Sequence, residues 1–238
     1  MTSLSEILLY TFLAGACIPV GALLAMAENL RPGWLENELR HSIIAFGGGI
    51  LLAAVALVLV PEGEEYLHHS PLSTLILIAG GLAFFALESW MGRKKREKPQ
   101  LIAMLLDYMP ESVALGGAFA LGASSAPLLA VLIGLQNLPE GFNAFRELDD
   151  KQPGQRRKLI TFMAMLSLIG PVLAWIGWAW LTQYTQLLGC IMLFASGGIL
   201  YLIFQDIAPQ AHIRKHWAPP LGAVLGFAFA MIGNQLLC

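Results

Sequence analysis

Charged residues are scarce in this chain. Only 13% of its 238 residues are Asp, Glu, Lys or Arg, whereas 57% are hydrophobic and the mean hydropathy is +0.67. A soluble domain carries about a quarter of charged residues. The shortage therefore excludes an ordinary soluble domain and predicts an integral membrane protein.

Other shortages exclude further classes. The net charge is -2, so there is no basic excess of the kind that nucleic-acid binding needs. The three cysteines lie far apart and form no CxxC pair, which argues against a zinc site or a disulfide framework. Residues 1–40 lack a basic stretch followed by a small-residue cleavage site. We therefore expect no cleaved signal peptide, and the first apolar stretch is interpreted as a membrane span.

Long apolar stretches recur along the whole chain. A spanning helix needs about 20 mostly apolar residues. The sequence contains eight such stretches, at roughly 4–26, 41–60, 71–92, 101–122, 126–146, 158–180, 186–208 and 218–237. Their connections are short, so we expect one all-α transmembrane domain over residues 1–238.

The basic residues indicate the orientation of these spans. All 14 Lys and Arg residues fall between spans one and two, three and four, five and six, or seven and eight. The positive-inside rule places these four loops in the cytoplasm and both termini outside. A wrong number of spans would scramble this segregation. We therefore expect a multi-pass protein of the plasma membrane, which in a bacterium is the inner membrane.

An internal repeat links spans two and seven. Residues 46–52 (FGGGILL) and 194–200 (FASGGIL) align at one offset, and the same offset aligns Pro61 with Pro209 near the ends of these spans. The two spans run in opposite directions, which is typical of inverted repeats in secondary transporters. The alternative is that small residues and prolines simply recur in packed membrane helices. The repeat predicts a 3+2+3 arrangement, with triplets at about 1–92 and 158–238 around central helices within 101–146.

The two central spans share a polar motif. Residues 107–112 (DYMPES) and 136–141 (QNLPEG) both follow the pattern polar-polar-x-Pro-Glu-small. A spacing of four residues puts both polar positions of each motif on one helix face. With a rise of 1.5 Å per residue, Asp107 and Glu140 should lie about 9 Å inside the cytoplasmic edge, and Glu111 and Gln136 about 15 Å inside. The motifs therefore predict four polar side chains meeting at two matching depths.

Carboxylates at such depths need a compensating charge. Each acidic residue at a helix centre costs about 2.5 to 3.5 kcal/mol, and a divalent cation would neutralise them. The alternative is that the acids are protonated and hydrogen-bonded to neighbouring helices. Pro110 and Pro139 each free a backbone carbonyl one turn earlier, beside the acids. Asn143 and Glu147 extend the face of Glu140 towards the cytoplasm and predict a transport path.

These motifs resemble those of a known family. Residues 136–141 resemble the fifth-span signature of the ZIP family of divalent metal transporters, and residues 107–112 look like a diverged copy of its fourth-span signature. Residues 59–63 (LVPEG) are similar to the family's second-span ending. The resemblance covers essentially the whole chain. It implies a binuclear metal site with the primary ligands Asp107, Glu111, Gln136 and Glu140, and a secondary site at Tyr108 and Asn137 that shares Glu140.

Departures from the family pattern favour one metal ion over two. The family's usual fourth-span histidine is Asp107 here, and the following asparagine is Tyr108, a poor ligand when protonated. Span six contains no carboxylate to complete a second site. The primary ligands are all oxygens, which favours harder ions such as Mn²⁺, Fe²⁺ or Mg²⁺, although carboxylates also bind Zn²⁺.

The expected function is transport of a divalent metal ion, which is the substrate, by alternating access across the lipid bilayer. An intramembrane enzyme is disfavoured because there is no HExxH, no GxGD-like motif and no nucleophile with an adjacent base. The remaining alternative is a transport-dead or repurposed relative that senses metal or carries another solute. Glycines in spans three and eight suit either a homodimer or packing within the chain: Gly80, Gly81, Gly222 and Gly226.

Overall fold

The computed structural model describes residues 3–28, 38–93, 99–149, 152–211 and 218–237, and these residues contain helices and no strand. Most of the predicted basic loops lie outside the described residues. The helices are α1 (Leu4–Glu28), α2 (Glu38–Ala54), η2 (Val55–Leu59), α3 (Val60–Tyr66), α4 (Leu72–Arg93), α5 (Pro99–Leu121), α6 (Ala126–Leu148), α7 (Pro153–Leu166), α8 (Ile169–Trp180), η3 (Leu181–Gln183), α9 (Thr185–Leu202), η4 (Ile203–Ile207), α10 (Ala208–Ala211) and α11 (Leu221–Leu237).

Several of these elements form continuous rods. Within the described residues, six helices are long and apolar enough to cross a membrane: α1, the rod from Arg40 to Tyr66, α4, α5, the run from Gly154 to Gln183, and the rod from Thr185 to Ala211. The prediction of a helical, multi-pass membrane protein is thereby confirmed. Two helices miss these criteria, because α6 is rich in polar residues and α11 has 17 residues.

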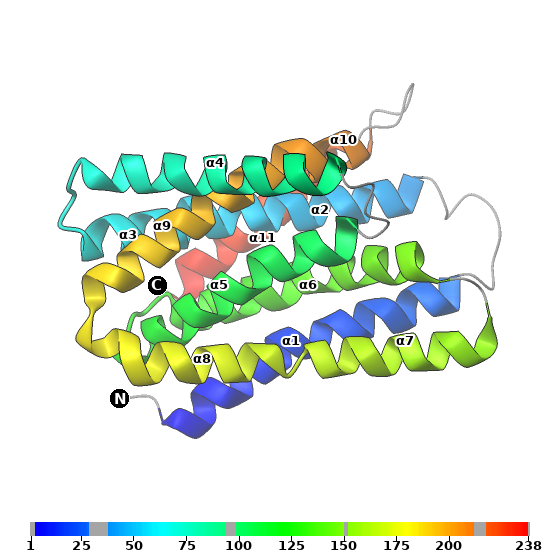
Figure 1. Ribbon diagram of the computed structural model, residues 1–238, viewed down its shortest axis with the longest axis horizontal. Helices are drawn as coiled ribbons and strands as arrows, with labels where there is room; N and C mark the ends of the chain where they lie inside the picture. The colour runs from blue at the N-terminus through cyan, green and yellow to red at the C-terminus, as the bar shows by residue number, and fades with distance from the viewer. Residues whose placement is uncertain (1–2, 29–37, 94–98, 150–151, 212–217, 238) are drawn as a thin grey trace.

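The central helices of the sequence are also central in space. Figure 1 shows α5 and α6 between a group formed by α1, α7 and α8 and a group formed by α2, α4, α9 and α11. Helix α1 packs against α6 and α5 against α8, while α2 packs against α11 and α4 against α9. Both termini lie at one end of the bundle, and the end of α6 and the start of α7 lie at the other.

Glycines bring the outer helix pairs into backbone contact. A side chain at Gly226 of α11 would collide with the carbonyl oxygen of Phe46 in α2, and one at Gly80 of α4 with that of Phe194 in α9. Gly222 lies equally close to the carbonyl oxygen of Ser42. Of the two roles considered for these glycines, packing within the chain is the one found. Packing within the chain therefore accounts for Gly80, Gly222 and Gly226, and a homodimer stays a prediction.

Two π-helical turns occur at corresponding places in the repeat. Segment η2 ends two residues before Pro61, and η4 ends two residues before Pro209. A proline lacks an N–H and clashes with the carbonyl four residues earlier, so the preceding turn widens and bonds five residues back. Accordingly, the N–H of Val60 bonds to the carbonyl of Val55. The repeated glycines and prolines are thus matched by a repeated backbone feature.

The sixth predicted span is interrupted. The sequence predicted a membrane span at roughly 158–180, and within this span α7 ends at Leu166 and α8 begins at Ile169. The cause is Pro171, which cannot donate to the carbonyl of Ser167. That carbonyl instead accepts a hydrogen bond from the hydroxyl of Tyr108 in α5, at 3.4 Å. The predicted span is confirmed, because the run from Gly154 to Gln183 is long and apolar enough to cross a membrane.

Candidate metal site

A short turn sets α5 and α6 antiparallel. Helix α5 ends at Leu121 and is followed by Gly122, whose φ of 73° lies in the left-handed region that glycine tolerates best. The N–H of Ala123 bonds back to the carbonyl of Ala118, as in a glycine-terminated helix end. The turn fixes the register between the two helices, and therefore the depth at which their polar residues meet.

The polar residues of α5 and α6 form two cross-helix pairs. The amide Nε2 of Gln136 donates a hydrogen bond to Oε2 of Glu111. The carboxyl groups of Asp107 and Glu140 lie within hydrogen-bonding distance of each other. These are the pairs that the depth argument predicted. Whether they hold a metal ion stays a prediction.

Burial makes this group unusual. Asp107 is 3% exposed, Gln136 is 1% exposed and Glu111 is fully buried. In the described part of the chain, no Lys, Arg or His forms an ion pair with Asp107, Glu111 or Glu140. Asp107 and Glu111 therefore lie in the core of the bundle and Glu140 is half-buried beside them, and none of the three has a basic partner among the described residues.

Several oxygens in this region have no hydrogen-bond partner. They are all acceptors: Oε1 of Glu111, Oε1 of Gln136, Oε2 of Glu140, Oδ1 of Asn137 and Oδ1 of Asn143. A buried acceptor without a partner costs about 1 to 3 kcal/mol. A row of unpartnered acceptors on one helix pair would be stabilised by a cation or by a molecule that donates hydrogen bonds. A divalent cation and its water molecules meet that need.

The acidic side chains alone do not complete a metal shell. Among the described residues, no three His, Cys, Asp or Glu side chains converge into a group that could hold a metal ion. Oδ1 of Asp107 also accepts a hydrogen bond from the N–H of Tyr108 at 2.8 Å. A metal ion at this place would therefore need the amide oxygen of Gln136, or water, in addition to the carboxylates.

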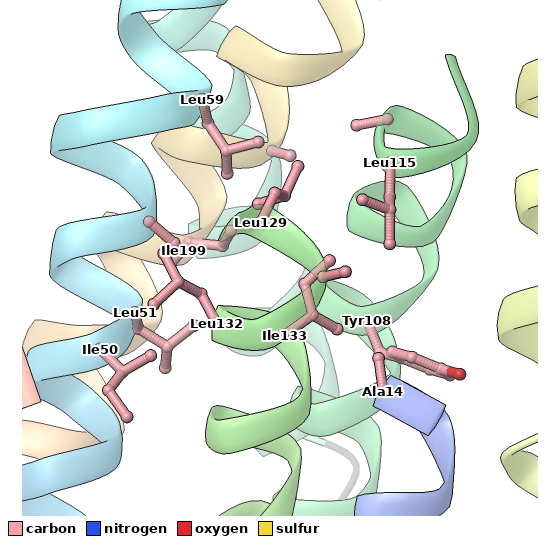
Figure 2. Close-up of a cluster of buried hydrophobic side chains, with 14 of the residues drawn as sticks. Ala14, Ile50, Leu51, Leu59, Tyr108, Leu115, Leu129, Leu132, Ile133 and Ile199 are labelled. Atoms are coloured by element: carbon pink, nitrogen blue, oxygen red, sulfur yellow. The ribbon is translucent and has the colours of Figure 1, made fainter. Parts of the chain in front are cut away.

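The residues of the implied second site make hydrogen bonds to other helices, although Oδ1 of Asn137 stays unpartnered. The amide Nδ2 of Asn137 donates to the carbonyl of Ala14 at 3.0 Å. Tyr108 is buried, and its hydroxyl donates to Ser167. Figure 2 shows its ring beside Ala14, with the hydroxyl directed away from the labelled leucine and isoleucine side chains. Tyr108 thus bonds to the break between α7 and α8.

Two small cavities adjoin Glu140, each of about 30 Å³, which is the volume of one water molecule in the liquid. One is also lined by Asn143 and by Gln210 of α10, and the other by Asp107 and by Asp206 of η4. Asp206 and Gln210 were not predicted as site residues. The signal for Gln210 was available, because it follows the repeated proline Pro209 in the same way that Glu62 follows Pro61.

The predicted path leads towards a second acidic region. Asn143 is nearly buried, and Glu147 is half-buried one turn further along α6. Glu147 and Glu88 of α4 both lie close enough to Asp206 for their charges to interact. The polar face that the sequence predicted on α6 therefore continues from Glu140 towards η4 and the end of α4.

An apolar cluster lies on the other side of the site. Figure 2 shows Leu59, Leu115, Leu129, Leu132 and Ile133 packed between α2, α5 and α6. These side chains are at most 1% exposed. Leu115, Leu129, Leu132 and Ile133 lie along α5 and α6 between the polar pairs and the α5–α6 turn. The cluster therefore separates the polar pairs from that end of the bundle.

Comparison with known proteins adds no family assignment. No protein-family model matches this chain, and no curated protein matches it. The resemblance to the ZIP family therefore depends on the motifs of α5, α6 and the α2 rod, and membership in that family stays a prediction.

Proposed function

We propose that the protein is a divalent metal ion transporter related to the ZIP family. The observation that supports this most is the row of buried, unpartnered acceptor oxygens on α5 and α6 beside three carboxyl groups without a basic partner. A folded protein tolerates such a group where an ion or proton passes or binds. The metal ion is the substrate, and the protein carries it across the lipid bilayer.

The proposal includes eight crossings in a 3+2+3 arrangement with both termini outside. Helix α6 is surrounded by other helices, so its polar residues need not face lipid. The inner pairing of α1 with α6 matches that of α5 with α8, and α2 with α11 matches α9 with α4. An inverted repeat predicts this correspondence. The paired π-helical turns support the same proposal.

The proposed ligands are Asp107, Glu111, Gln136 and Glu140. All offer oxygen, which suits Mn²⁺, Fe²⁺ or Mg²⁺ and accommodates Zn²⁺. The hydrogen bond of the Tyr108 hydroxyl to Ser167 favours a single ion over two, whereas Asn137 keeps an unpartnered Oδ1 that remains open to metal. Gln136 donates a hydrogen bond from Nε2 to Glu111, and its oxygen Oε1 has no partner. Gln136 can therefore keep this hydrogen bond and bind metal through Oε1.

The proposed path runs from these ligands past Asn143 and Glu147 to the cytoplasm. The apolar cluster around Leu132 closes the other side, so the described conformation would be one of two alternating states. In the other state, α5 and α6 would have to expose the same oxygens past Leu59 and Leu129.

One observation favours a second candidate, a relative that binds metal or another solute without transporting metal. Among the described residues, the acids pair across the helices without converging on one point. Two such pairs also suit protonated carboxyl groups, the alternative drawn from the sequence. The two candidates differ in whether metal crosses the membrane.

Uptake by purified protein in liposomes tests the proposal. Mn²⁺, Fe²⁺, Zn²⁺ and Mg²⁺ are offered separately, and metal binding in detergent is measured by equilibrium dialysis. Uptake of at least one ion, lost in Glu140→Ala and kept in Glu6→Gln, would support transport. Glu6 is a suitable control because it is an exposed acid at the start of α1. Binding without uptake would favour the second candidate, and neither binding nor uptake would overturn the metal site.

A further inference from the structure

A pocket lies at the end of the bundle where α6 ends and α7 begins. It measures about 370 Å³ and is lined by residues of α5, α6 and α7. It lies at the last turn of α6, about two turns along that helix from Glu140. Neither the metal ligands nor the proposed path contribute to it, so it needs a separate explanation.

One wall of the pocket is cationic. The guanidinium of Arg156 makes two contacts with the carboxylate of Asp149, from Nε to Oδ1 at 3.0 Å and from Nη2 to Oδ2 at 2.8 Å. This ion pair joins α7 to the end of α6 and balances the charge of Asp149. Lys158, which is exposed, has no ion pair within the described residues. It therefore leaves the pocket with a net positive charge.

Another part of the pocket lining is apolar. It consists of Leu101 of α5 with Leu159 and Phe162 of α7. Phe162 is 43% exposed, one helical turn further into the membrane-spanning run than Lys158. A soluble anion would contact only the cationic wall. A molecule with an anionic head and an apolar chain would contact both walls.

We propose that this pocket binds an anionic phospholipid, with its phosphate at Lys158 and an acyl chain along Leu159 and Phe162. Basic pockets between helices on the cytoplasmic side are established binding places for acidic headgroups, and the cytoplasmic leaflet is rich in them. The lipid would contact α5, α6 and α7 together, and so would stabilise the junction between the central pair and α7. This inference goes beyond the proposed metal transport, and it rests on that proposal only for the orientation that places this end of the bundle in the cytoplasm.

Native mass spectrometry of the full-length protein tests the proposal. The protein is exchanged into detergent containing equal amounts of phosphatidylglycerol and phosphatidylcholine, and retained lipid is counted. We expect preferential retention of phosphatidylglycerol, lowered about fivefold in Lys158→Gln. Arg157→Gln is the matched control. Arg157 is the neighbour of Lys158, carries the same charge, is exposed and does not line the pocket. Equal losses in the two variants would overturn the proposal.

A second variant tests the apolar wall. Phe162→Ala should also lower retention of phosphatidylglycerol, although it leaves every charge in place. Thermal unfolding provides a further arm: phosphatidylglycerol should raise the unfolding temperature, and inorganic phosphate should not. A similar rise with inorganic phosphate would show a free-anion site and overturn the lipid assignment. The experiment involves no metal ion, so its failure is distinguishable from failure of the proposed function.

Discussion

At the scale of single residues, the two glutamates of the site each leave one carboxylate oxygen without a partner. Glu111 uses one oxygen to accept from Gln136 and leaves the other without a partner. Glu140 faces Asp107 with its carboxyl group and also leaves an oxygen unpartnered. Each residue is thus held in place by one contact while an acceptor remains for an ion. A side chain that binds a passing metal ion needs both a fixed position and an acceptor oxygen that is not already hydrogen-bonded.

The first prediction concerns these two glutamates. Glu140→Ala and Glu111→Ala should each reduce metal uptake at least about tenfold, since each removes a charged ligand from the core. Insertion and folding should persist, because removing an unpaired buried charge relieves a desolvation cost. Uptake in liposomes is measured alongside gel filtration, with Glu6→Gln as the control. Folded variants with normal uptake would remove these residues from the site.

The second prediction concerns metal preference. Asp107→His should shift uptake towards Zn²⁺ relative to Mn²⁺, because a neutral nitrogen replaces a charged oxygen. It also restores the residue usual in the family that this chain resembles. Competition between the two metals in the uptake assay gives the ratio. An unchanged ratio would mean that Asp107 is no direct ligand, and that the site lies at least one turn away along α5.

At the scale of helices, prolines and glycines determine where the backbone departs from a simple rod. Pro171 releases the carbonyl of Ser167, and Tyr108 satisfies it from another helix. Pro61 and Pro209 each follow a π-helical turn. Pro110 and Pro139, in contrast, lie within helices that continue without a break. A proline therefore predicts a disturbed hydrogen bond, and the neighbouring helices decide what form the disturbance takes.

The third prediction concerns helix contact. Gly226→Ala should lower the free energy of unfolding by about 1 to 3 kcal/mol, because the added methyl group must separate α11 from the backbone of Phe46. Gly154→Ala is the matched control, since nothing lies within 4 Å of the position a methyl group would take. It should be neutral or slightly stabilising, as alanine favours a helix more than glycine. Unfolding temperatures in detergent are compared. A Gly226→Ala protein as stable as the control would contradict the close packing of α2 and α11.

At the scale of the molecule, the bundle has two distinct ends. Both termini lie at one end, together with the turn between α5 and α6. Arg146, Arg156, Arg157 and Lys158 belong to the end of α6 and the start of α7, at the other end. The separation of basic residues seen in the sequence is therefore a separation in space for these described residues. Which end faces the cytoplasm follows from the positive-inside rule alone.

The fourth prediction tests that orientation. In a cysteine-free protein, Ser70→Cys should be labelled by an impermeant reagent in intact cells, and Arg157→Cys only after the cells are opened. Both positions lie in accessible ends of the bundle. Ser125, which the sequence would pair with Ser70, is 8% exposed and is unsuitable as a reporter. Lys94 lies outside the described residues. Labelling of position 157 in intact cells would reverse the proposed topology.

Much of this architecture follows from local patterns. Apolar runs determine the helices and the membrane class, because a bilayer admits only segments that satisfy their own backbone hydrogen bonds. A spacing of four residues, together with the short turn at Gly122, determines that Asp107 faces Glu140 and Glu111 faces Gln136. These relations depend only on helix geometry and on the register of one hairpin, so the sequence sufficed to predict them.

Only the tertiary structure decided which oxygens remain available. Asn137 bonds to Ala14, Tyr108 bonds to Ser167, and Asp206 and Gln210 approach Glu140 from a helix far along the chain. Likewise, the packing of Gly226 against α2 was one of two options in the sequence. The physical reason is that hydrogen bonds and close contacts between helices depend on packing across the bundle, whereas a motif specifies only the face and depth of its own residues.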